Sequence, residues 1–133
     1  MCSKILSINN EPEIEIGLFG LGTLGSGVIE YLQKFYDSRK TGIRLKISHI
    51  VVANPSKNRE ISIDTAIISN DKNNILNNDK ISIVVELIGG IEPSKSIIIE
   101  AFRKGKDVVT ANKALLAKHG NELFKLAEEN NVN

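Results

Sequence analysis

The chain has 133 residues, which is enough for one domain with its own hydrophobic core and short for a two-domain enzyme. Its 41% hydrophobic and 25% charged residues are ordinary for a soluble globular protein, and a net charge of +1 gives no reason to expect a nucleic acid or a membrane as partner. The single cysteine, Cys2, rules out an intrachain disulfide and suits a reducing cytoplasm. No stretch resembles a signal peptide, and none reaches the ~20 apolar residues that a membrane span needs.

An apolar, β-branched run at residues 14–19 predicts the first strand. The run ends at residues 20–25 in Gly-Leu-Gly-Thr-Leu-Gly, which fits the pattern G-x-G-x-x-G. A helix is expected from residue 23 to about residue 38, with an apolar face made of Leu24, Val28, Leu32 and Phe35. Strand, glycine turn and helix in this order are typical of a dinucleotide-binding unit, and an unrelated glycine-rich turn is the competing interpretation.

The three glycines of this turn have separate predicted roles. Gly20 permits a tight turn out of the strand, Gly22 lets the backbone approach a diphosphate, and Gly25 lets the helix pack closely on the strand. The helix start offers free N–H groups and the positive end of a dipole to the phosphates. The predicted diphosphate contacts are therefore Gly20, Leu21, Gly22, Thr23, Leu24 and Gly25.

A second strand is predicted at residues 43–52, and the loop at 53–59 follows it. In a dinucleotide fold this loop meets the adenosine ribose, where an acid about 20 residues beyond the glycines would hold the 2′-hydroxyl. No acidic residue occurs between positions 37 and 60; Asn54 stands at the expected place, with Lys57 and Arg59 close behind. A neutral hydrogen-bonding group with two cations slightly favours NADP over NAD, and a solvated basic loop is the alternative.

The rest of the chain predicts further strands and helices in alternation. We expect a short strand at 61–69, a polar connection with one helical turn at 70–80, strands at 81–87 and 107–110, and helices at 93–105 and 113–130. The last helix is expected to break near His119 and Gly120 and to bury Leu123, Phe124 and Ala127. This alternation predicts one α/β domain of the Rossmann type, a doubly wound and mostly parallel sheet in an order near 3-2-1-4-5 with helices on both faces.

Three blocks of the sequence resemble the cofactor domain of homoserine dehydrogenase. They are residues 17–28, residues 84–93 with the sequence Val-Val-Glu-Leu-Ile-Gly-Gly-Ile-Glu-Pro, and residues 105–120, which include Thr-Ala-Asn-Lys. They lie in the family's order and spacing across almost the whole chain. The resemblance implies an NAD(P)-dependent oxidoreductase that interconverts L-homoserine and L-aspartate 4-semialdehyde in threonine and methionine biosynthesis.

Proteins of this family are much longer than 133 residues. Their substrate-binding and dimerisation region supplies a second catalytic lysine and the acidic residues that hold homoserine, and these are absent from this sequence. We therefore expect residues 1–133 to be a single NAD(P)-binding domain that turns over homoserine poorly by itself. Many members carry Arg-Asp where this chain has Ala53-Asn54, so the resemblance does not settle the cofactor preference, and the formation of a homo-oligomer stays open.

The ends of the later strands are expected to hold the nicotinamide. In the family pattern Lys113 lies beside the nicotinamide and the substrate oxygen, which makes it the predicted catalytic residue; a solvated surface lysine is the alternative. Thr110 and Asn112 end a strand at the edge where ligands bind, although Asn112 equally fits a helix cap. Gly89 would let the backbone lie close to the nicotinamide, or is simply a flexible turn.

Several interpretations remain open on the sequence. Glu86 lies in an apolar strand and is expected to reach a ribose hydroxyl or a lysine, or to lie in solvent at the end of the sheet. His49 and His119 have no ligand spacing, so no metal site is predicted. A dinucleotide-sensing regulatory module without catalysis, or a fragment that pairs with a longer enzyme, are the rival functions.

Overall fold

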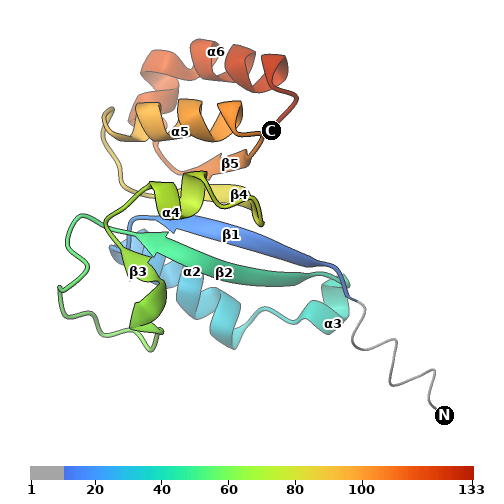
Figure 1. The fold of residues 1–133 in the computed structure, drawn as a ribbon, viewed down its shortest axis with the longest axis vertical. Coiled ribbons are helices and arrows are strands. Elements are labelled where there is room, and N and C mark those ends of the chain that lie inside the picture. Colours follow the sequence, from blue (N-terminus) through green and yellow to red (C-terminus); the bar gives the residue numbers. More distant parts are fainter. Residues whose placement is uncertain (1–10) are drawn as a thin grey trace.

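The computed structural model describes residues 11–133 as one five-stranded sheet with helices on both faces (Figure 1). Its strands are β1 (Glu13–Phe19), β2 (Arg44–Val51), β3 (Ile68–Ser69), β4 (Ile81–Glu86) and β5 (Asp107–Thr110). They lie in the order β3-β2-β1-β4-β5, and every neighbouring pair is parallel. The predicted order and the Rossmann-type fold are confirmed, whereas Cys2 lies outside the described residues.

The helices divide between the two faces of the sheet. They are α2 (Thr23–Lys34), α3 (Ser38–Thr41), α4 (Asn73–Leu76), α5 (Ser94–Arg103) and α6 (Lys113–Glu129), and the 3₁₀ turn η1 (Thr65–Ile67) precedes β3. Ile29 of α2 packs with Leu18 and Ile50 on one face, and α4 and α5 cover Phe19 on the other. The long α6 packs against α5, on the side of α5 away from β1 and β2 (Figure 1).

Strand β1 determines this layering. Successive side chains of a strand point to opposite faces, so Leu18 joins the cluster under α2 and Phe19 joins the cluster under α4 and α5. Both side chains are fully buried, as expected of a central strand in a parallel sheet. The end of β1 therefore delivers Gly20 to the middle of the carboxyl edge of the sheet.

Two predicted helix boundaries are wrong. The first helix ends at Lys34 rather than near residue 38, because the Asp37 carboxylate accepts the Arg39 N–H and starts the separate short helix α3. The last helix is unbroken from residue 113 to residue 129. His119 therefore lies within the helix, where its Nδ1 is 3.5 Å from a carboxylate oxygen of Glu122, and caps no break.

The expected strand at 61–69 shrinks to the two residues of β3. Only Ile50 and Val51 of β2 have a partner there, and the Asp64 carboxylate accepts the Ala66 N–H to start η1 just before it. The single helical turn around Ile75 and Leu76 is confirmed as α4.

The predicted apolar faces of two helices are also wrong in part. Leu24 is 59% exposed and Phe35 is 70% exposed, because α2 turns Gly25 and Ile29 toward the sheet instead. On α6, Leu123 and Ala127 are buried as predicted, but Phe124 is 66% exposed. This orientation of α2 follows from the close contact between Gly25 and the backbone of Gly20, which keeps the Gly25 side of the helix against the turn.

Candidate functional site

The glycine turn between β1 and α2 has two positions that the fold itself reserves for glycine. Gly20 has φ +95°, and a Cβ there would lie 2.9 Å from the carbonyl oxygen of Leu87. A Cβ at Gly25 would collide with the carbonyl oxygen of Gly20. Both observations agree with the predicted tight turn and with the close packing of helix and strand.

Gly22 differs from these two because a Cβ there would meet no atom of the described chain within 4 Å. Its backbone has φ −86° and ψ −150°, which other residues also adopt. Nothing within the described fold therefore requires glycine at this position.

The first turn of α2 begins at Gly22, the N-cap residue, without a side-chain cap and without an acidic residue. Gly22 is exposed, and the first intrahelical bond runs from the Ser26 N–H to the Gly22 carbonyl oxygen at 2.9 Å. The amides of Thr23, Leu24 and Gly25 come before that bond, so a helix leaves them without an intrahelical partner. Such a start attracts an anion such as a diphosphate.

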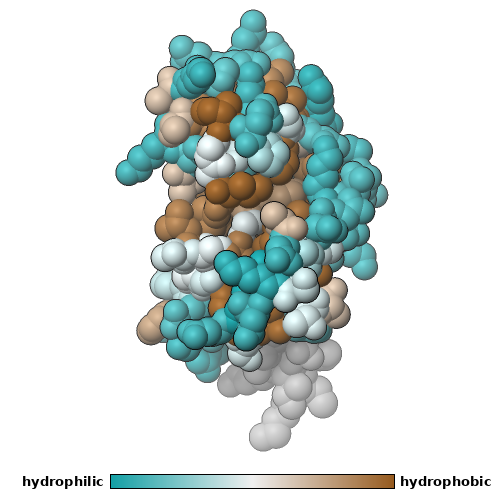
Figure 2. Space-filling model, turned by 90° about the vertical axis from the view of Figure 1, so that its left-hand side faces the viewer, coloured by the Kyte–Doolittle hydropathy of each residue, from teal (hydrophilic) through white to brown (hydrophobic). Residues whose placement is uncertain are grey.

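A cavity of about 680 Å³ opens beside this turn at the carboxyl edge of the sheet. Figure 2 looks onto this edge and shows hydrophobic atoms in the middle of the face, between hydrophilic regions above and below. The apolar part of the wall consists of Phe19, Leu21, Val51, Val52, Leu87, Ile88, Pro93 and Ile97. An apolar cavity of this size with a few polar groups is typical of a small-molecule site.

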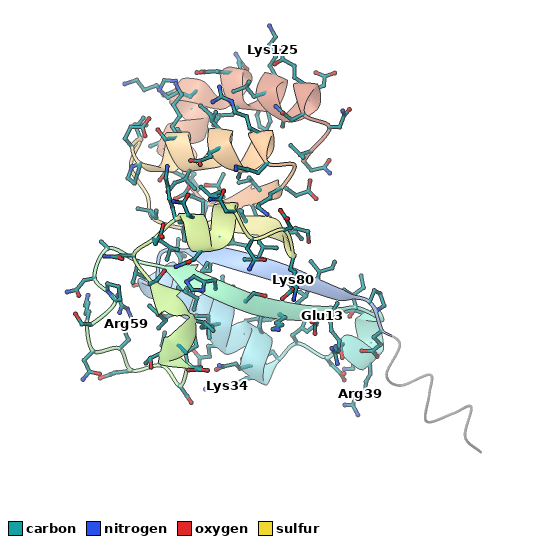
Figure 3. All side chains as sticks on the ribbon, in the orientation of Figure 1. Glu13, Lys34, Arg39, Arg59, Lys80 and Lys125 are labelled. Atoms are coloured by element: carbon teal, nitrogen blue, oxygen red, sulfur yellow. The ribbon has the colours of Figure 1, made fainter. Side chains whose placement is uncertain are left out.

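The polar part of the cavity wall is cationic and contains no acidic residue among its described members. It includes Asn54, Lys57 and Arg59 from the loop after β2. The Arg59 guanidinium donates to the carbonyl oxygens of Asn54 at 2.9 Å and Lys57 at 3.0 Å, so it also holds the loop closed. Figure 3 shows Arg59 on this loop, far from Lys125 on α6.

Lys72 is a wall residue that the sequence did not reveal. It follows β3, and its ammonium lies 2.8 Å from a carboxylate oxygen of Glu100 on α5. The sequence contains little indication of Lys72 as a site residue, because the strand before it, β3, has only two residues. It was therefore not apparent that the segment after β3 lies at the carboxyl edge of the sheet, beside the glycine turn.

Glu86 at the end of β4 is fully buried, which excludes the expected positions in solvent or at a ribose. Its Oε1 accepts the N–H groups of Ile88 at 2.7 Å and Gly89 at 3.3 Å and the Ser94 hydroxyl at 2.9 Å. Its Oε2 accepts the Thr110 hydroxyl at 2.7 Å. The expected lysine partner is therefore replaced by two hydroxyls and two backbone amides.

The turn between β5 and α6 is tied to the same region. The Asn112 side chain accepts the Leu115 N–H at 3.1 Å, which confirms the helix-cap interpretation, and its amide group also donates to the Gly90 carbonyl oxygen. Lys113 is the first residue of α6 and is exposed.

The predicted site residues thus form two groups at one edge of the sheet. The cavity beside the glycine turn gathers Gly20, Leu21, Gly22, Asn54, Lys57 and Arg59. Thr23, Leu24 and Gly25 continue from it into α2, whereas Gly89, Thr110, Asn112 and Lys113 lie outside the cavity, at or just beyond the ends of β4 and β5.

Between residues 11 and 133, no group of three or more histidine, cysteine, aspartate or glutamate side chains is placed to bind a metal ion. None of the helices in this part of the chain combines the length and the apolar composition needed to cross a bilayer.

Comparisons with known proteins agree with this geometry. A sequence model of the family described as "Homoserine dehydrogenase, NAD binding domain" matches residues 20–133. The homoserine dehydrogenases of Bacillus subtilis and Neisseria gonorrhoeae are 36% identical over 119 residues and 39% identical over 121 residues. The matches cover 88% and 90% of this chain, but the chain spans only 28% of the length of each of these curated relatives.

Solved structures give the same result. A homoserine dehydrogenase from S. aureus at pH 7.0 superimposes with a TM-score of 0.83 at 41% identity, over 92% of this chain and 32% of that chain. A homoserine dehydrogenase from Thiobacillus denitrificans gives a TM-score of 0.78 at 35% identity, over 90% of this chain and 28% of that chain.

Proposed function

Because the chain belongs to the family of homoserine dehydrogenase NAD-binding domains, we propose that it supplies the cofactor half of a homoserine dehydrogenase. The proposed reaction is L-homoserine + NAD(P)⁺ = L-aspartate 4-semialdehyde + NAD(P)H, a step toward threonine and methionine. The observation that carries the proposal is Gly22, which is exposed at an uncapped helix start beside an apolar cavity. These features fit a bound dinucleotide.

In the proposed binding mode, the diphosphate lies against Gly22 and the amides of Thr23 and Leu24. The adenosine occupies the cavity between the apolar wall and the loop with Asn54, Lys57 and Arg59. We expect a preference for NADP, because a 2′-phosphate would meet cations and no carboxylate on this wall. NAD fits the same cavity, and Asn54 would then face the free 2′-hydroxyl.

The nicotinamide end is assigned to the ends of β4 and β5, near Gly89, Thr110 and Asn112. The cofactor supplies the hydride acceptor for the carbinol carbon of homoserine. Lys113 is the proposed catalytic residue, because its amine at the start of α6 would exchange a proton with the substrate oxygen. The contacts to homoserine itself and any subunit contacts are assigned to the other part of the enzyme.

Residues 1–133 are proposed to be a single domain that binds the cofactor and turns over homoserine poorly by itself. Positioning two reactants contributes roughly 7–11 kcal/mol to a barrier at best, and this chain holds only one of them. A regulatory module that senses dinucleotides is the rival, but no contact in residues 11–133 favours it.

The test is a fluorescence titration of the 133-residue chain with NADH and with NADPH, followed by an assay of homoserine oxidation. We expect saturable binding, tighter for NADPH, and little or no turnover. Failure to bind either dinucleotide would refute the proposed function. Homoserine oxidation at the rate of a full-length enzyme would refute the assignment of the substrate contacts to the other part.

A further inference from the structure

The buried carboxylate of Glu86 is the most highly connected polar group near the proposed nicotinamide end. It accepts four hydrogen bonds, from the N–H groups of Ile88 and Gly89 and from the hydroxyls of Ser94 and Thr110. These donors belong to the loop after β4, the first turn of α5 and the end of β5. One side chain therefore joins the loop after β4 and the start of α5, which follow it closely in the sequence, to Thr110, which lies 24 positions away.

The network extends from Glu86 to the start of α6. The Thr110 oxygen, which donates to Glu86, accepts the Asn112 N–H at 3.0 Å, and the Asn112 side chain caps α6 and also contacts the Gly90 carbonyl oxygen. Lys113 directly follows Asn112. The position of Lys113 relative to the Gly89–Gly90 backbone is consequently fixed through hydrogen bonds that lead back to Glu86.

Glu86 acts on a ligand only indirectly. Its exposed fraction and that of Ser94 are both 0%, so neither side chain touches a molecule at the edge of the sheet. Gly89 has φ +85° and Gly90 has φ +75°, so this loop has a conformation that few other residues would hold. Because its N–H points to Glu86 and its carbonyl oxygen lies 3.3 Å from the Ser94 hydroxyl, the backbone of Gly89 offers a ligand its Cα rather than its amide.

The same bonds determine the polarity of Thr110. Its single hydroxyl proton is donated to Glu86, and one lone pair accepts the Asn112 N–H. The remaining lone pair is an acceptor only. A ligand at Thr110 would therefore contribute a donor, such as a carboxamide N–H or a ribose hydroxyl.

We infer that Glu86 is a positioning residue for the nicotinamide half of the site. It holds the Gly89–Gly90 backbone, the acceptor at Thr110 and the Asn112–Lys113 turn in one arrangement, so that they contact the nicotinamide riboside together. The inference rests on the proposed function and assigns Glu86 no contact with the diphosphate or the adenosine. Its loss should weaken only the part of the affinity that depends on the nicotinamide riboside.

The experiment compares Glu86→Gln with the matched variant Glu128→Gln, which makes the same chemical change at an exposed residue near the end of α6. Each chain is titrated with NADPH and NADH, and then with ADP-ribose and 2′-phospho-ADP-ribose, which lack the nicotinamide. In Glu86→Gln the amide oxygen can still accept from Ser94 and from the N–H groups of Ile88 and Gly89. The new NH₂ group faces Thr110, however, so the Thr110 hydroxyl changes from a donor to an acceptor in this contact. Circular dichroism and urea unfolding check that each variant is folded.

We expect Glu86→Gln to raise the Kd of the reduced dinucleotide about tenfold, equivalent to about 1.4 kcal/mol. The Kd of the matching ADP-ribose should change less than about twofold, and Glu128→Gln should change neither. The blue shift of the bound nicotinamide fluorescence should also shrink. Equal weakening of both ligands, or no weakening of the dinucleotide, would overturn the inference.

Ser94→Ala is the second variant, and it decides the outcome if Glu86→Gln does not fold. It removes one donor to Glu86 and leaves the three others, so we expect a selective loss of about threefold in dinucleotide affinity. An unselective loss, or none, would contradict the positioning role. If the unmodified chain binds none of the four ligands, the proposed function fails before the role of Glu86 is reached.

Discussion

The replacement Gly22→Ala tests whether a ligand is the reason for glycine at the start of α2. The Cβ of alanine would enter open space, and φ −86° suits it, so the fold accepts the change. Alanine is a poorer N-cap than glycine, but it also reduces the conformational entropy of the unfolded chain, and each effect is on the order of 0.5–1 kcal/mol. The free energy of unfolding should therefore change by less than about 1 kcal/mol.

The affinity for the cofactor should fall far more. A methyl group at this position would displace a diphosphate from the amides at the helix start, and a hydrogen bond to a charged group contributes about 1.5–3 kcal/mol. Loss of one such bond raises the Kd roughly 10- to 150-fold. The assay is the same nucleotide titration, with urea unfolding of each variant in parallel.

Two neighbouring glycines provide the controls. Gly27→Ala also enters open space, but inside α2, so it should stabilise the fold by about 0.5–1 kcal/mol and leave nucleotide binding unchanged. Gly25→Ala collides with the backbone at Gly20 and should cost about 1–3 kcal/mol of stability. If Gly22→Ala binds NADPH and NADH as tightly as Gly27→Ala does, the diphosphate does not lie against Gly22.

Three further predictions concern other parts of the molecule. Asn54→Asp should raise the ratio of the NADPH Kd to the NADH Kd about tenfold, because a carboxylate would face the 2′-phosphate; an unchanged ratio in the titration would contradict that position. Burial lowers the pKa of His49 despite the opposing charge of Asp71, so protonation of His49 should not reduce the free energy of unfolding above pH 6.5 but should reduce it as the pH falls through the folded pKa. Urea midpoints at pH 7 and pH 5 measure this loss, and the midpoint should differ less between the two pH values in His49→Gln. Lys106→Met should cost about 1–3 kcal/mol, because the buried ammonium donates to the carbonyl oxygens of Asn78 and Ile81; an unchanged urea midpoint would contradict this.

The lowered pKa of His49 agrees with the hydrogen bond between its Nε2 and the Ser69 hydroxyl. The Ser69 hydroxyl oxygen receives the Asn74 side-chain amide at 2.9 Å and the Asp71 N–H at 3.3 Å, so its own proton is left for Nε2 of His49 at 2.9 Å. An imidazole that accepts at Nε2 is neutral. Protonation would require Ser69 to release one of its other partners, and this loss would add to the effect of burial.

The central strands could be predicted from the sequence because burial on both faces leaves an unbroken apolar run. Leu18 and Phe19 of β1 are fully buried, and β4 was correctly predicted to within one residue. The edge strand β3 is too short to show such a run, because it consists only of Ile68 and Ser69, which pair with β2. The faces of α2 were misjudged because Gly25, which has no apolar side chain, makes its closest contact with the turn.

The two halves of the site differed for a related reason. The turn from Gly20 to Gly25 is proposed to bind through consecutive backbone atoms, so the spacing of its glycines is visible in the sequence. The contact of Glu86 with Thr110 joins residues that are 24 positions apart. The parallel register of β4 and β5 makes these two residues neighbours, so the adjacent strand ends were the only signal that could have revealed the pair.

This difference implies different tolerance to substitution in the two halves. Where we propose that the backbone binds, as at Thr23 and Leu24, the exposed side chains would be free to vary as long as the helix still begins at Gly22. Where side chains hold the backbone, a change at Glu86 leaves several partners unsatisfied at once, and a change at Ser94 or Thr110 removes one of its donors. A chain could therefore keep its diphosphate site while losing the alignment of Lys113 with the nicotinamide, so nucleotide binding alone is a weaker indication of a working dehydrogenase domain than the selectivity for the nicotinamide riboside.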